Sequence, residues 1–206
     1  DPENEDLLKA QSIHIQLIEE MENHLFRIVM IAIEGSKLDM IPLLCELGSD
    51  SLRMRVYNWL FESHPEIFEH FPMRAELEEF LFHHNHFLLN TYYVVHGKPH
   101  TAAIRLFEIV ALNQYPFISL TLEQRKQTFC EIYKDLALAE EQGYRTPYPY
   151  PQLRPMFVQR QIDQLSIQIE ANLMIDKPLS LDELLKECKE AHKPIQILKC
   201  MELLEK

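Results

Sequence analysis

Apolar residues recur at helical spacing along most of the chain, and the first stretch with this pattern is the longest. Over residues 3–34 they lie three and four positions apart, on broad stripes that overlap around the helix they predict. Gly35 follows this stretch, and we expect it to take the left-handed conformation that ends many helices. The pattern predicts one long helix or two. Its apolar positions are Leu7, Leu8, Ile13, Ile15, Leu17, Ile18, Met21, Leu25, Ile28, Val29 and Ala32.

The alternation of helical stripe and short turn continues to the end of the chain. Ser/Thr-x-x-Glu/Gln patterns at Ser63, Thr121 and Ser180 match the capping box that begins many helices. The predicted fold class is therefore all-α: an irregular α-solenoid of stacked antiparallel helix pairs, with residues 1–206 as a single α-helical domain. Besides a short helix after Ser63, helices are expected over residues 38–47, 50–62, 73–95, 99–114, 121–142, 156–174, 180–192 and 195–205.

Residues 144–155 interrupt the helical pattern. Four prolines and three tyrosines fall within these twelve positions. Prolines at every second position remove backbone donors and favour the extended polyproline II conformation over a helix. We predict a Pro/Tyr-rich internal linker packed on the surface, with a recognition site for a proline-binding module as the alternative.

Composition excludes several classes of function. The chain has only four glycines and neither glycine-rich phosphate motif, so we predict no nucleotide cofactor. Its 32 acids against 20 Lys and Arg give a net charge of −12, so no direct binding to nucleic acid or to an anionic membrane is expected. The longest apolar run is too short to cross a bilayer. Because the sequence begins at Asp1, we expect it to be a fragment of a larger protein, and the family resemblance described below implies a C-terminal one.

No motif in the sequence predicts a catalytic residue. There is no G-x-S-x-G, and the many acids indicate a solvated charged face more than a catalytic pair. The cysteines contain no C-x-x-C, and most of them continue apolar helical stripes, where a free cysteine behaves as a small hydrophobe. We therefore predict no enzyme activity and no small-molecule substrate. The cysteines are Cys45, Cys130, Cys188 and Cys200.

His83 and His86 form the one cluster that suggests a metal. On a continuous helix over residues 73–95 the two rings would share a face. A third ligand would still be needed, and no H-E-x-x-H or E-x-x-H motif supplies it. We predict no metal site and interpret the cluster as a polar helix face. A metal-binding helical bundle enzyme is the alternative from another functional class.

An aromatic group occupies the predicted helix over residues 50–62. Tyr57, Trp59 and Phe61 lie within five positions of one another. Large aromatic side chains dominate the burial in helical cores. We expect Trp59 to be largely buried and to contact both flanking helices.

Several segments together resemble one protein family. They are Ser49-Asp-Ser-Leu-Arg-Met-Arg-Val-Tyr-Asn-Trp-Leu60, Leu77-Glu-Glu-Phe-Leu81, Leu89-Asn-Thr-Tyr-Tyr93, Thr101-Ala-Ala-Ile-Arg-Leu106, Ile118-Ser-Leu-Thr-Leu-Glu-Gln-Arg125, Gln161-Ile-Asp-Gln-Leu-Ser-Ile-Gln-Ile169, Glu187-Cys188 and Cys200. In order and spacing, over about residues 45–205, they are similar to the C-terminal α-solenoid of the inner-ring non-FG scaffold nucleoporins, the 155/170-kilodalton class. The chain looks like a divergent member, because Met73-Arg-Ala-Glu-Leu-Glu78 replaces the family's S-P-x-L-E and residues 144–155 have no counterpart there.

The resemblance implies a structural scaffold of the nuclear pore complex, located in the nucleus at the nuclear envelope. Such proteins support nucleocytoplasmic transport of mRNA and protein. The implied partners are other nucleoporins, including disordered linker segments. A helical adaptor or trafficking solenoid outside the pore is the alternative.

The last predicted helix pair is the expected partner-binding site. A terminal pair has no neighbour beyond it, so its four apolar residues Leu184, Leu185, Ile197 and Leu198 cannot all face inward. We expect them to bind a short apolar motif. Because of the net charge of −12, basic residues beside that motif should speed association.

Overall fold

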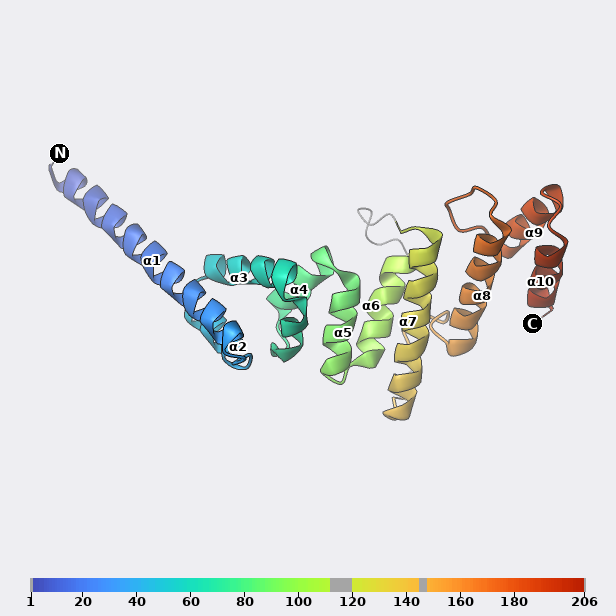
Figure 1. Cartoon of the computed structure of the whole chain (residues 1–206), viewed down its shortest axis with the longest axis horizontal. Coiled ribbons are helices and arrows are strands. Elements are labelled where there is room, and N and C mark those ends of the chain that lie inside the picture. The colour runs from blue at the N-terminus through green and yellow to red at the C-terminus, as the bar shows by residue number, and fades with distance from the viewer. Residues whose placement is uncertain (1, 112–119, 145–147, 206) are drawn as a thin grey trace. The chain divides into compact units, whose positions relative to one another are not determined.

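The computed structural model describes residues 2–111, 120–144 and 148–205 (Figure 1). Within them the chain forms ten α-helices, one 3-10 helix and no β-strand, so the all-α prediction is confirmed. The helices are α1 (Pro2–Glu34), α2 (Met40–Leu47), α3 (Asp50–Ser63), the 3-10 helix η1 (Pro65–His70), α4 (Ala75–His84), α5 (His86–Val95), α6 (Pro99–Val110), α7 (Leu122–Glu141), α8 (Pro155–Ala171), α9 (Leu181–Glu190) and α10 (Pro194–Leu204).

The helices group into two compact units, residues 1–88 and residues 89–206. The boundary falls in the first turn of α5. That residues 1–206 form one domain stays a prediction.

Two of the three expected capping boxes form. The side chains of Thr121 and Ser180 accept from the backbone N–H three residues later, and the side chain of that later residue accepts from the backbone N–H of the cap. The box expected at Ser63 is wrong. Ser63 is the last residue of α3, and the N-cap of η1 is His64, whose side chain makes no capping hydrogen bond. A short helix does begin there, because Pro65 at its first position supplies a suitable φ.

Residues 2–34 form one helix, α1, and not two. The left-handed residue that follows it is not Gly35 but Ser36, with φ 53°. The N–H of Gly35 still donates to Ile31 in helical register, at 2.9 Å, so the helical backbone continues one residue further than the glycine suggested.

The core of residues 1–88 is built around Tyr57 and not around Trp59. Tyr57 is almost fully buried, with its ring centroid 5.5–6.1 Å from those of Phe68, Phe71 and Phe80. Trp59 is largely but not fully buried, as predicted, and it is less buried than Tyr57. It lies beside the buried face of α3 and packs edge-on against Phe26 of α1, at 5.5 Å.

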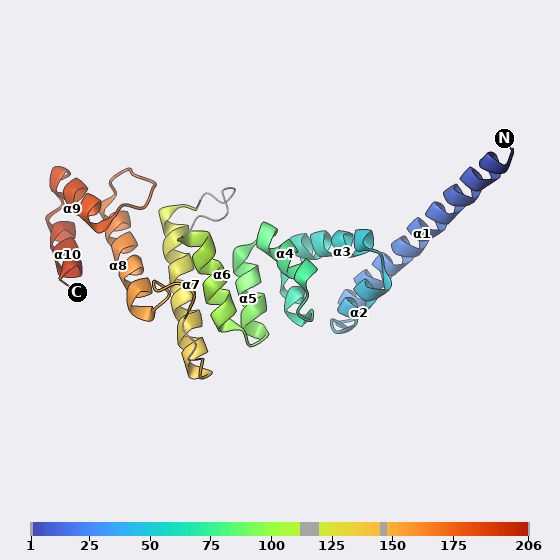
Figure 2. The same ribbon diagram turned by 180° about the vertical axis from the view of Figure 1, so that it is seen from behind.

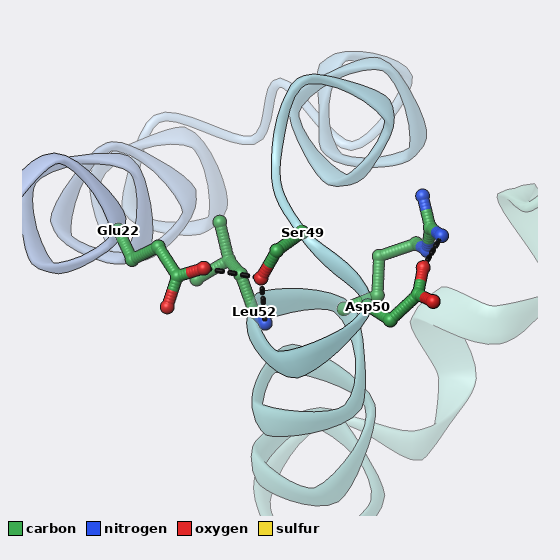
Figure 3. A network of polar contacts seen from close by, with 5 residues as sticks. Glu22, Ser49, Asp50 and Leu52 are labelled. Atoms are coloured by element: carbon green, nitrogen blue, oxygen red, sulfur yellow. Dashed lines mark hydrogen bonds and ion pairs between the residues drawn. The ribbon is translucent and has the colours of Figure 1, made fainter. Parts of the chain in front are cut away.

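A polar network holds the second half of α1 against α3. Ser49, the N-cap of α3, donates its hydroxyl to Glu22 of α1 and accepts from the N–H of Leu52 at 3.2 Å (Figure 3). Arg55 donates to the side chain of Asn23 at 2.8 Å and lies 4.3 Å above the ring of Phe26. These hydrogen bonds and the contact of Arg55 with Phe26 therefore fix one face of α1 against α3.

In residues 89–206 each helix from α6 onward packs on the next. Contacts join α6 to α7, α7 to α8, α8 to α9 and α9 to α10, and α10 also returns to α8 (Figure 2). Ala102, Ala103 and Leu106 of α6 are fully buried at these contacts. Burial here depends on neighbours in sequence, as in repeat-like helical stacks.

The described part of residues 144–155 is non-helical as far as residue 154, and residues 145–147 lie outside the described residues. The Tyr150 ring packs on Phe107 of α6 with centroids 5.4 Å apart, and its hydroxyl donates to Glu108 at 3.1 Å. The segment is thus anchored to α6 by a tyrosine.

Candidate functional site

The expected partner-binding residues lie on α9 and α10, which are joined by a tight connection. The capping box at Ser180 begins α9, and Pro194 begins α10. Between them His192 takes the left-handed conformation, with φ 55°, and the N–H of Lys193 donates to Cys188 at 2.9 Å. This geometry folds α10 back onto α9.

A buried glutamine of α8 fixes the loop that leads into α9. The side-chain amide of Gln168 donates to the carbonyls of Ile175 and Lys177, at 3.2 and 2.7 Å, and its oxygen accepts from the N–H of Leu179 at 3.0 Å. These three hydrogen bonds satisfy the polar atoms of the buried Gln168 side chain. They also give the backbone carbonyl and N–H groups of the loop a partner in place of water. The start of α9 is therefore held firmly on α8.

The four predicted residues do not share one environment. Leu184 is completely buried, whereas Leu185 and Ile197 are half-buried against the same core. Leu198 is 61% exposed. Leu184 is therefore out of a partner's reach in this arrangement, and partner binding by the other three stays a prediction. The core cluster comprises Ile167, Ala171, Leu179, Leu181, Leu184, Cys188, Cys200 and Leu203.

The exposed apolar surface of α10 includes more residues than the two, Ile197 and Leu198, that the sequence predicts for this helix. Ile195, Leu198, Met201 and Leu204 follow one another at intervals of three residues and are 43–62% exposed. We call these four residues the α10 row. A signal for it was present, because seven of the eleven residues of α10 are apolar, more than one buried face can hold.

The attraction expected between this site and a basic segment is weaker than the net charge of the whole chain suggests. Residues 1–88 contain 17 of the acids and 6 of the bases, a net charge of −11, which leaves −1 for residues 89–206. On α10 itself Lys199 pairs with Glu170 of α8. Attraction for a basic segment thus belongs mainly to residues 1–88.

The buried cysteines pack as small apolar side chains, and burial does not favour the thiolate form that a nucleophile needs. Burial raises the pKa of the Cys45 thiol to about 12 and that of Cys200 to about 11, and it also raises the pKa of Cys188. A reactive cysteine needs a lowered pKa, because the thiolate is the nucleophile. These thiols are protonated at neutral pH.

The shared face expected for His83 and His86 is wrong. The helix stops at Asn85, whose backbone is extended, so His83 ends α4 and His86 begins α5. The Asn85 side chain accepts from the N–H groups of Phe87 and Leu88, at 3.0 and 3.1 Å, and so caps the new helix. His86 keeps a buried Nε2 without a partner among the described residues, and burial lowers its pKa.

One buried carboxylate lies between α7 and α5. Asp135 is 4% exposed, and burial raises its pKa to about 7, although a hydrogen bond from Asn90 acts in the opposite direction. The second oxygen of Asp135 and the side-chain oxygen of Asn90 have no partner among the described residues.

In the described ranges no three His, Cys, Asp or Glu side chains gather as a metal site would require. None of the helices there has the length and apolar character needed to cross a membrane. The chain matches no protein-family model, and neither a curated protein nor a solved structure matches it.

Proposed function

We propose that the chain is a structural scaffold segment of the nuclear pore complex, and that its stacked helices form an irregular α-solenoid of antiparallel pairs. The observation that carries the proposal is the ordered series of nucleoporin-like segments. Several of their matching positions are core residues here: Ala102, Ala103 and Leu106 on α6, with Cys188 and Cys200 on α9 and α10. The resemblance therefore involves residues that set helix packing.

The packing of residues 89–206 supports a scaffold role. From α6 to α10, successive helices pack on one another, an arrangement that leaves extended surfaces for other proteins to bind. The buried thiols are protonated and the two histidines lie on different helices. Binding of other proteins is the function these features favour over catalysis.

We place the binding site for a linker nucleoporin on the α10 row. Leu198 and Ile195 present exposed apolar surface on α10, against which a short apolar motif could pack. Leu185 and Ile197 form the flank of that surface, and Leu184 supports it from the core. The partner is a mostly disordered segment of another nucleoporin.

The direct test is capture of nucleoporins by the tagged chain from a nuclear-envelope extract. Scaffold and linker nucleoporins should be enriched on the native chain and depleted on Leu198→Asp. Leu47→Asp is the matched control, because Leu47 is 70% exposed but lies on α2. Coat or trafficking proteins in place of nucleoporins would favour the adaptor alternative and overturn the pore assignment.

A peptide titration then tests the site itself. A linker-nucleoporin peptide with an apolar motif should bind the native chain and the Leu47→Asp variant equally. Binding should fall about tenfold or more for Leu198→Asp, because a charge would enter an apolar contact. Equal affinity for all three chains would place the site elsewhere.

A further inference from the structure

A second unpartnered surface lies on α1, and its spacing is that of a coiled coil. Seven exposed residues follow one another at alternating intervals of four and three, which is the heptad spacing of a helix–helix seam. We call them the α1 seam; none is a Lys, Arg, Asp or Glu. At 1.5 Å per residue the seam is about 32 Å long. It consists of Ala10, His14, Leu17, Met21, His24, Ile28 and Ile31.

The seam is distinct from the face by which α1 packs on its own unit. Phe26 and Val29, which pack inward, lie about 100° or more around the helix from Leu17, whereas the buried Ala32 lies about 60° from it, at the edge of the seam. The seam therefore stays exposed even along the half of α1 that contacts α2 and α3: Ile28 is 43% exposed and Ile31 is 64% exposed. The first half of α1 extends away from α2 and α3 in both views (Figures 1 and 2).

Two opposite charges flank the seam on one side without a partner on their own helix. Glu20 and Arg27 each precede a seam residue and lie seven positions apart. No Lys or Arg lies three or four positions from Glu20, and no acid lies at those positions from Arg27. Both side chains are exposed, and neither makes an ion pair with another described residue.

We propose that the α1 seam binds a second copy of this chain, with the two α1 helices antiparallel. In that arrangement Met21 faces His24 of the partner subunit and Ile28 faces Leu17 of the partner subunit. Glu20 then lies beside Arg27 of the partner subunit, and the two-fold symmetry makes this ion pair twice.

The flanking charges are what select this arrangement. In a parallel pair Glu20 would instead face Leu25 of the partner subunit and Arg27 would face Ala32 of the partner subunit, so neither charge would gain a partner. The antiparallel dimer is the arrangement in which both orphan charges are paired. This inference is independent of the proposed scaffold function.

Sedimentation equilibrium of the full chain tests the proposal through a charge-reversal cycle. The native chain should reach twice its 24.5 kDa mass with rising concentration. Glu20→Arg and Arg27→Glu should each weaken the dimer about tenfold, since each turns two attractions into two repulsions. The double variant should regain the native dissociation constant. The two single variants change the net charge of the chain in opposite directions. If net charge alone controlled association, their dissociation constants would therefore shift in opposite directions.

A second variant tests the seam apart from its flanks. Leu17→Asp should abolish the dimer and leave the helix content of the monomer unchanged, because Leu17 is 59% exposed. A native chain that stays monomeric at about 200 µM overturns the proposal. Single reversals with opposite effects, or a double variant as weak as either single one, overturn the antiparallel arrangement and with it the proposal.

Discussion

Replacing Asp135 by Asn should remove a pH-dependent penalty from the stability of residues 89–206. The Asp135 carboxylate is 4% exposed on α7, and burial raises its pKa from 3.8 to about 7. One of its oxygens and the side-chain oxygen of Asn90 lack partners among the described residues. A proton on Asp135, or the amide of an asparagine there, supplies a donor where only acceptors are now unpaired.

The sign follows from proton linkage. Because the pKa of Asp135 is higher in the folded chain than in the unfolded chain, the folded state binds more protons between about pH 4 and pH 7. The stabilising effect of the protonated carboxyl is complete below the unfolded pKa and is lost as the pH rises through the folded pKa. A shift of about 3 units corresponds to at most about 4 kcal/mol.

Scanning calorimetry of the native chain, Asp135→Asn and Asp176→Asn at pH 5 and pH 8 measures this effect. The melting temperature of Asp135→Asn should exceed that of the native chain at pH 8 and approach it at pH 5. Asp176 is exposed in the loop before α9 and serves as the matched control, with parallel behaviour at both pH values. The reasoning is refuted if the difference between the native chain and Asp135→Asn is the same at both pH values.

Three further predictions concern stability at neutral pH. Leu184→Ala should cost about 2–5 kcal/mol because the side chain is fully buried, while Leu198→Ala should cost about 0.5 kcal/mol or less; equal costs in urea unfolding would contradict the placements. Tyr57→Ala should destabilise the chain more than Trp59→Ala, which thermal melts followed by circular dichroism can rank. Thr121→Ala removes a formed capping box and should cost about 1 kcal/mol in the same melts, and an unchanged melting temperature would argue against the cap.

Most of the helices could be predicted because local signals agree with one another. The capping box at Ser180 and the proline at 194 indicate where α9 and α10 begin to within one residue, whereas the expected end of α9 at residue 192 lies two residues beyond Glu190. The break between α4 and α5 was missed. Asn85 is also a good N-cap residue, but apolar residues continue on both sides of it, so periodicity alone predicts an unbroken helix.

Burial was harder to predict than helix position. The sequence shows that Tyr57 and Trp59 are both aromatic residues on α3, but which ring becomes the centre depends on the neighbours that reach it. Phe68 and Phe80 come from η1 and α4 and surround Tyr57, whereas Trp59 packs against Phe26 of α1 and the ring of His64. Such contacts depend on tertiary packing that no local pattern encodes.

The same reasoning separates the two exposed apolar surfaces, the α10 row and the α1 seam. Each lies on a helix with more apolar positions than one buried face can hold, so apolar content by itself does not say what covers either of them. Charge does distinguish them. Lys199 beside the α10 row is already paired with Glu170, so a partner there is selected mainly by apolar fit and its affinity should change little with salt. Glu20 and Arg27 beside the α1 seam make no ion pair with another described residue and are complementary to each other across a two-fold axis, so self-association should respond to charge reversal. Peptide binding that weakens steeply with salt would contradict the first half of this argument, and a dimer insensitive to both reversals would contradict the second.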